Sequence, residues 1–372
     1  MASRIPMSPV DRDTILEYVA HDQPLIKKVA AGLSLAGAAL EGAKFMLCEM
    51  AGCDFTGADL AKATFVSCDL GGARFSEAKL DGTRFVSCTL SAAEFGESRL
   101  HLTQFIGGKA DRSRFRDADL MQASFAKTDL TAADLSDATL ERSAILDCPI
   151  EGLALGNAVL STVTVTKADL RNVDLAATHV DIALFAEADL SEKDLSEQTW
   201  KRCTFSKAKF QGTRLSKANL GNSIFHECDF SGAALDGVVA QKACFTGSKL
   251  GAVDFTGSQL EMANFANAGL AGARFDGSRM ASAVFLEADC RGVRFERCDL
   301  RQAELSYADL SAANFAAASF SNTKLHAARR DQTLLLGVTG SIIDTDQEQA
   351  IAELYAPSSV RLDGEKDQRE LA

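Results

Sequence analysis

Apolar residues recur along this chain at every fifth position. From Leu35 to Leu325, nearly every residue whose number is a multiple of five is Phe, Leu or another apolar residue, and all 22 phenylalanines occupy these positions. A small residue, usually Ala, Cys, Ser or Thr, lies two positions earlier, as Ala123 does before Phe125. We call each fifth residue a centre, i, and the small position i−2. Inward positions therefore alternate in steps of two and three residues.

This period fits neither an α-helix nor a flat β-strand. A helix advances about 100° per residue, so its apolar side chains would spread around the whole axis. A flat strand would turn successive centres to opposite faces, because five is an odd number. A step of two residues suits a short extended side, and a step of three suits a corner. The pattern predicts a coil that turns i and i−2 toward one core.

A second period of twenty residues predicts the number of sides. Apolar residues directly follow the centres at Met46, Val66, Val86 and Ile106, whereas polar or small residues follow the centres between them. Twenty residues hold four pentapeptides, so each turn of the coil has four sides. The repeat then spans about 15 coils, an all-β solenoid.

The repeat resembles that of the pentapeptide repeat family. The family motif A(D/N)LXX appears in residues 58–60, 118–120, 218–220 and 308–310. The resemblance covers about four fifths of the chain and implies a right-handed quadrilateral β-helix, the hand being taken from the family. It says less about function, because such solenoids bind many things.

The chain divides into three predicted regions. Residues 1–32 precede the repeat and are predicted to form a helical cap, since Ser8 and Pro9 suit a helix start. An independent interaction helix is the alternative. Residues 33–325 form the repeat. Residues 326–372 are predicted to hold an apolar cluster, a cap helix at 344–356 and a disordered tail. The alternative for this end is dimerisation, which the family resemblance implies.

Within the repeat, residues 141–200 are less regular. No Phe occupies a centre between 141 and 180, and Lys193 and Gln198 occupy i−2 positions that ordinarily hold small residues. Trp200 replaces the usual Leu or Phe at a centre. Burying Lys193 without a partner would be costly, so we expect residues 191–200 to bulge outward.

Cysteines and histidines give no indication of catalysis. Eight of the ten cysteines occupy i−2, where a small buried side chain packs well. The five histidines lack metal-ligand spacing, and no nucleophile motif or phosphate loop is present, so we expect no enzyme activity, cofactor or metal. No secretory signal or membrane-length apolar run appears. We expect reduced thiols in a bacterial cytoplasm, with signal-peptide-independent secretion as the alternative.

The net charge of −12 argues against direct nucleic-acid binding. It permits mimicry of a nucleic acid. One column, at i−1 on one side of the coil, is rich in acidic residues but interrupted by lysines at 109, 209 and 249. The principal members of this predicted acidic edge are Asp129, Asp169, Asp189, Asp229, Asp289 and Asp309.

An outward apolar column is the second candidate surface. Coil stacking would align its members into an apolar stripe, and such stripes are typical of binding surfaces. The alternative interpretation is β-propensity at a tolerant position. The predicted stripe consists of Met46, Val66, Val86, Ile106 and Leu146.

Three functions fit this organisation. The first is a non-enzymatic scaffold or adaptor that binds a protein partner of unknown identity, with a homodimer through a solenoid end or the apolar stripe as a variant. The second is a DNA mimic, as the resemblance implies for members that protect gyrase. The third is an effector or accessory protein associated with secretion.

Overall fold

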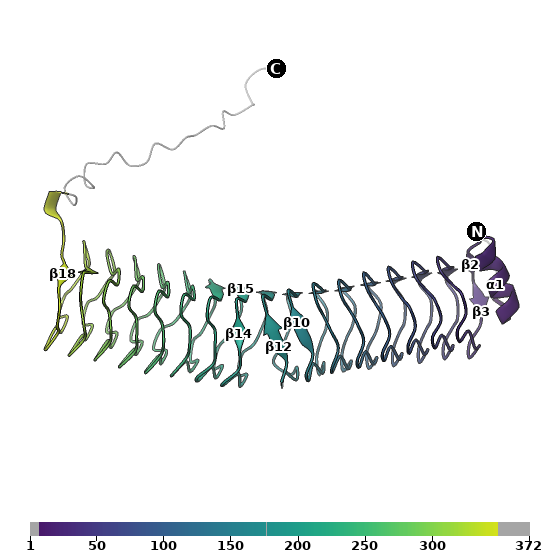
Figure 1. Ribbon diagram of the computed structural model, residues 1–372, viewed down its shortest axis with the longest axis horizontal. Helices are drawn as coiled ribbons and strands as arrows, with labels where there is room; N and C mark the ends of the chain where they lie inside the picture. Colours follow the sequence, from purple (N-terminus) through teal and green to yellow (C-terminus); the bar gives the residue numbers. More distant parts are fainter. Residues whose placement is uncertain (1–6, 176, 349–372) are drawn as a thin grey trace, which may run out of the picture.

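The structure is a computed structural model that describes residues 7–175 and 177–348. The described chain winds into one long, gently curved coil, with helix α1 (Arg12–Ala20) at the N-terminal end (Figure 1). Centres and i−2 residues point inward: Phe85 and Cys88, for example, are almost completely buried. The predicted all-β solenoid is therefore confirmed.

Left-handed residues at i+2 turn nearly every described corner of the coil. Gly82 has a φ of 68°, but Glu77 and Lys62 adopt similar values of 58°, so most corners do not depend on glycine. Main-chain hydrogen bonds then join successive coils. The Asp54 N–H donates to the Leu33 carbonyl oxygen (3.0 Å), and the Phe55 N–H donates to the Arg74 carbonyl oxygen (2.7 Å). Regular coils thus satisfy the main-chain polar groups of their neighbours.

The strands are short because each coil side holds only one pentapeptide. The strands of the N-terminal half are β1 (Ser8–Pro9), β2 (Leu25–Ile26), β3 (Lys28–Val29), β4 (Lys44–Met46), β5 (Thr64–Val66), β6 (Arg84–Val86), β7 (Gln104–Ile106), β8 (Ser124–Ala126) and β9 (Ala144–Leu146). Those that follow are β10 (Val159–Ser161), β11 (Thr164–Thr166), β12 (His179–Asp181), β13 (Leu184–Ala186), β14 (Trp200–Lys201), β15 (Thr204–Ser206), β16 (Ile224–His226), β17 (Thr323–Lys324) and β18 (Ile342–Ile343).

One side of the coil carries the longest parallel sheet in the described part of the chain. Its strand order is β16-β15-β13-β11-β9-β8-β7-β6-β5-β4-β2. Strands β10, β12 and β14 form a shorter sheet on another side. Partners lie twenty residues apart, as Phe65 and Phe85 do, so equivalent side chains stack in columns.

Stacked phenylalanine rings fill the N-terminal half of the core. The ring of Phe85 stacks on those of Phe65 and Phe105, with centroids 5.1 and 5.0 Å away. It also meets the rings of Phe75 and Phe95 edge to face. Both arrangements are favourable geometries for aromatic pairs.

The coil extends beyond the predicted range of 33–325 at both ends. Leu25 already pairs with Phe45, and Ser319 pairs with Thr339. At the N-terminal end, α1 buries Ile15, and Arg12 donates to carbonyl oxygens of the first complete coil. At the C-terminal end, residues 349–372 lie outside the described residues, and with them most of the predicted helix at 344–356 and the whole predicted tail.

Candidate functional site

The predicted apolar stripe lies on the outer face of strands β4 to β9. Strand register places Met46 beside Val66, Val66 beside Val86, and Val86 beside Ile106. Met46 and Ile106 are 38 % and 37 % exposed, while the two valines are half-buried. The column is therefore continuous and reaches solvent.

The stripe is longer than the sequence analysis predicted. Ile26 of β2 pairs with Met46 and is 42 % exposed. At the other end, Ala126 pairs with Leu146. Ile26 was missed because its coil precedes the recognisable repeat, although its position twenty residues before Met46 was a usable signal. From here the apolar stripe means Ile26, Met46, Val66, Val86, Ile106, Ala126 and Leu146.

Polar and basic residues border the stripe. On one side lie the i−1 residues of the same strands, among them Lys44 and Arg84. On the other side lie the corner residues, among them Ser87 and Lys127. Arg84 and Lys127 are exposed and form no ion pair with any described residue, whereas Lys44 pairs with Asp22 at 2.8 Å. The margin of the stripe is thus cationic.

The predicted acidic edge runs along the adjoining side of the coil. Isolated bridges align Asp169 with Asp189 and Asp289 with Asp309. Basic side chains pair with four of its six carboxylates. These pairs are Arg171 with Asp169 (2.6 Å), Lys209 with Asp189 (3.3 Å), Lys249 with Asp229 (3.3 Å) and Arg291 with Asp289 (2.6 Å).

The remaining two carboxylates accept local main-chain bonds. The Thr131 N–H donates to Asp129 and the Ser311 N–H donates to Asp309, both at 3.0 Å. Hydrogen bonding from Arg171 holds the pKa of Asp169 below its usual value. The edge is therefore a ladder of paired charges, and its field is weaker than its count of carboxylates suggests.

A third feature is a break in the main-chain hydrogen bonding between two successive coils. Residues 172–175 and 191–195, all of them described, form no main-chain hydrogen bond to each other, although such bonds join the equivalent segments of other coils. The Lys193 ammonium instead donates to the carbonyl oxygens of Arg171 (3.3 Å) and Val173. Desolvation lowers the pKa of Lys193. The long side chain at i−2 has separated the two coils.

The same separation reaches the next side of the coil. The Asn219 N–H donates to the Gln198 carbonyl oxygen (2.8 Å), but the equivalent Thr199 N–H makes no bond to Thr178. Trp200 is buried, with its ring centroid 5.4 Å from that of Phe185, and its Nε1 finds no hydrogen-bond partner among the described residues. We call this region, between residues 171–179 and 191–199, the coil opening; beyond it β12 and β14 pair again, Val180 with Trp200.

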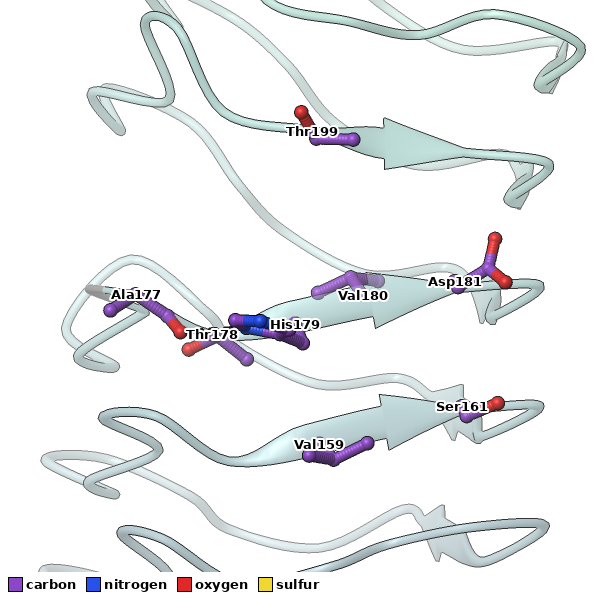
Figure 2. A pocket seen from close by; sticks show the side chains of 8 residues that line it. All are labelled: Val159, Ser161, Ala177, Thr178, His179, Val180, Asp181 and Thr199. Atoms are coloured by element: carbon purple, nitrogen blue, oxygen red, sulfur yellow. Dashed lines mark hydrogen bonds between the residues drawn. The ribbon is translucent and has the colours of Figure 1, made fainter.

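The coil opening differs from the predicted bulge. Residues 191–200 stay in register with the following coil, since Asp194 pairs with Arg214 and Thr199 with Asn219. The gap lies toward the preceding coil. A pocket of about 570 Å³ lies beside the gap, lined by residues of β10 and β12, by Thr178 before β12 and by Thr199 of the next coil. Figure 2 shows His179 and Asp181 at opposite ends of β12, with Thr199 on the next coil.

The described residues hold no group of histidines, cysteines and carboxylates arranged for a metal ion. All ten cysteines lie in the described ranges as free thiols, and all but Cys244 are buried. Burial raises the pKa of Cys228 to about 12, so that thiol is a packing group and a poor nucleophile. In the same ranges, no helix combines the length and hydrophobicity that crossing a membrane requires.

Two protein-family descriptions match most of the coil, and the matched residues are interrupted at the coil opening. Residues 38–115, 83–155 and 198–275 match the family described as the pentapeptide repeat region, and together these segments cover more than half of the chain. The chain belongs to the pentapeptide repeat family. The related description of pentapeptide repeats in eight copies matches residues 263–302 and 294–329.

Several solved pentapeptide repeat structures are similar to the chain. QnrB1, a plasmid-mediated fluoroquinolone resistance protein, is 22 % identical over 48 % of this chain and 90 % of its own, with a TM-score of 0.38. HetL of the cyanobacterium Nostoc, involved in heterocyst differentiation regulation, is 21 % identical over 82 % and 96 %, with a TM-score of 0.23. A thylakoid lumen protein of Arabidopsis thaliana is 27 % identical over 30 % and 70 %, with a TM-score of 0.24. No curated protein matches the chain in sequence.

Between the matched segments, residues 156–197 have no pentapeptide repeat match, and this stretch contains most of the coil opening. Its centres are apolar, so the repeat itself persists. At i−2 within this stretch, the larger residues Val163 and Val173 are buried in the core. Lys193, also at i−2, replaces main-chain bonding between the two coils with a side-chain bond to Val173.

Proposed function

We propose that this protein is a non-enzymatic scaffold that binds a protein partner through the apolar stripe. The observation that carries the proposal is the continuous outward column on β2 and β4 to β9, with exposed Met46 and Ile106. Contiguous exposed apolar surface with a polar border is typical of interfaces. The stripe alone is smaller than a stable interface of about 1,000 Å², so neighbouring surface must contribute.

The alternative of DNA mimicry has less support. A mimic needs a dense field of unpaired carboxylates, and four of the six acidic-edge aspartates have basic partners. Secretion as an effector rests on no feature of the described residues. We infer that the protein acts in a bacterial cytoplasm, which keeps buried thiols such as Cys48 and Cys68 reduced.

The test is a double variant, Val66→Lys with Val86→Lys. Both side chains point outward, so folding should persist while binding of the partner is lost. The measurements are partner capture from the native source and the mass in solution by light scattering.

The matched control is Thr166→Lys with Ala186→Lys, at equivalent outward positions on β11 and β13 beyond the stripe. Unchanged capture and unchanged mass in the valine variant would contradict the proposal. Equal loss in both variants would show that added charge on the sheet matters more than the stripe.

A further inference from the structure

The charges around the apolar stripe indicate what kind of partner it fits. We consider the β4–β9 face, which comprises the outward residues of strands β4 to β9 and the corner residue after each strand. Its cations are Lys44, Arg84 and Lys127, and its one carboxylate is Asp147, at the far end. This face is basic although the whole chain carries a net charge of −12.

Two of these cations are available to pair with a ligand. Arg84 and Lys127 are exposed and pair with no described acid, whereas Lys44 pairs with Asp22. Arg84 lies on one border of the stripe, two residues before Val86. Lys127 lies on the opposite border, directly after Ala126. A ligand on the stripe therefore meets a positive charge on either side.

A second copy of the chain does not complement this face. It would bring a second Arg84 and a second Lys127 to the interface, where Asp147 is the face's one carboxylate, and like charges disfavour such contacts. A polyanion such as DNA is also a poor match, because the surface between the cations is apolar and Lys44 is already paired with Asp22, which leaves Arg84 and Lys127 as the face's two cations without an ion pair to a described residue.

The spacing of the stripe suits a helix. Its side chains repeat once per coil, about 4.8 Å apart, because each coil contributes one strand. The pitch of an α-helix is about 5.4 Å, whereas same-face residues of an extended strand repeat at about 6.8 Å. From Met46 to Leu146 the stripe spans five coil steps, about 24 Å, which is the length of a helix of about 16 residues.

We propose that the β4–β9 face binds an amphipathic helix of a partner protein, with an apolar stripe flanked by acidic residues. This inference rests on the proposed function and adds the chemistry of the partner. The apolar side chains of the helix would pack between successive side chains of the stripe, such as Met46, Val66 and Val86. Its flanking carboxylates would pair with Arg84 and Lys127.

The test uses two synthetic helical peptides of about 18 residues with leucines at i, i+3, i+4 and i+7. One carries glutamates on the flanks and the other carries lysines at the same positions. Fluorescence anisotropy with the full chain should give at least about tenfold tighter binding of the glutamate peptide. In the double variant Arg84→Glu with Lys127→Glu, this preference should reverse.

The control is Lys242→Glu with Arg279→Glu, which reverses two exposed cations that lie away from the face and form no ion pair with a described residue, and it should leave the preference intact. Equal binding of both peptides, no binding of either, or a preference unaffected by Arg84 and Lys127 would overturn the inference. So would tighter binding to a DNA duplex or to phosphatidylserine vesicles than to the glutamate peptide. If the Val66 and Val86 variant still loses its native partner in any of these cases, the proposed interface stands and only the partner's chemistry is wrong.

Discussion

The side-chain ammonium of Lys193 donates a hydrogen bond to the main-chain carbonyl oxygen of Val173 on the preceding coil. In regular coils that carbonyl accepts a main-chain N–H, as the Leu33 carbonyl does from Asp54. Lys193 thus separates the two coils and also satisfies an acceptor that the separation exposes. An unsatisfied buried carbonyl costs about 1–3 kcal/mol, so this bond limits the penalty of the coil opening.

Replacing Lys193 and Gln198 by alanine should close the coil opening. Small i−2 residues would let the Asp194 and Thr199 amides bond to Val173 and Thr178, as equivalent amides do elsewhere. We expect slower hydrogen exchange at both amides and a free energy of unfolding raised by roughly 1 kcal/mol. Lys217→Ala, at an exposed corner, is the control. Unchanged exchange at Asp194 would mean that the opening has another cause.

The core phenylalanines should be intolerant of charge. Phe85→Asp buries a carboxylate among stacked rings with no cation in reach, so we expect loss of cooperative unfolding in the surrounding coils. Phe85→Leu keeps an apolar residue and should cost only about 1–2 kcal/mol. Val86→Asp changes the next, outward residue and serves as the control. A thermal transition of Phe85→Asp equal to that of the native chain would contradict the inward assignment.

Glycine is needed at residue 108 but less so at 107. A Cβ on Gly108 would lie 2.1 Å from the Cys88 carbonyl oxygen, and its φ is 78°. A Cβ on Gly107 meets only the Ser87 Oγ, at 3.7 Å. We expect Gly108→Ala to lower the free energy of unfolding by more than about 2 kcal/mol and Gly107→Ala by about 1. Denaturant unfolding of the two variants decides, and equal losses would contradict the steric argument.

Surface ion pairs should make stability depend on acid pH. Hydrogen bonding from Arg74, followed by that from Thr56, lowers the pKa of Asp54 to about 2. Because the folded pKa lies below the unfolded value, this carboxylate stabilises the fold above about pH 4, and the contribution fades as the pH falls toward 2. Asp54→Asn should therefore cost stability at pH 7 and little near pH 2. Urea unfolding at both pH values measures this difference, and a pH-independent difference would contradict the charge effect.

The paired acidic edge predicts no action on gyrase. Micromolar protein should leave gyrase supercoiling unchanged, because Asp189 and Asp229 are engaged by Lys209 and Lys249. The assay includes a charge-reversal variant at Asp169, Asp189 and Asp229. Inhibition or relief of supercoiling by the native chain, lost in this variant, would restore DNA mimicry as the function.

Most of the coil could be predicted because its core repeats a single rule. Phe85 and its equivalents identify the inward centres, and Met46 to Ile106 identify the four-sided turn. The first coil was missed because the i−2 residues of Leu25 and Ala30 are Gln23 and Lys28, which are not small. Helix α1 and strand β1 cover that coil, so its i−2 residues need not stack against a preceding coil.

The candidate surfaces were only partly predictable. A fixed register makes the stripe visible in the sequence, since Val66 and Val86 must align. The pairing of the acidic edge depends on side-chain reach, as when Arg171 bonds Asp169 on its own coil. The sequence shows that Lys193 occupies a position that ordinarily holds a small residue. It does not show which neighbouring coil moves away, because that depends on the main-chain carbonyl oxygens within reach of the Lys193 ammonium.

The register of the coil also determines how this protein tolerates insertions and deletions. Partners lie twenty residues apart from Val29 and Glu49 to Ser319 and Thr339. Losing or gaining five residues would keep every centre in phase with the core, yet it would carry all later surface columns a quarter turn around the axis. Only a change by a multiple of twenty residues would keep the members of the stripe on one side of the coil. A duplication of five residues can therefore bring different surface residues into one column while the core residues keep their positions. Relatives with the same core consequently need not share a partner.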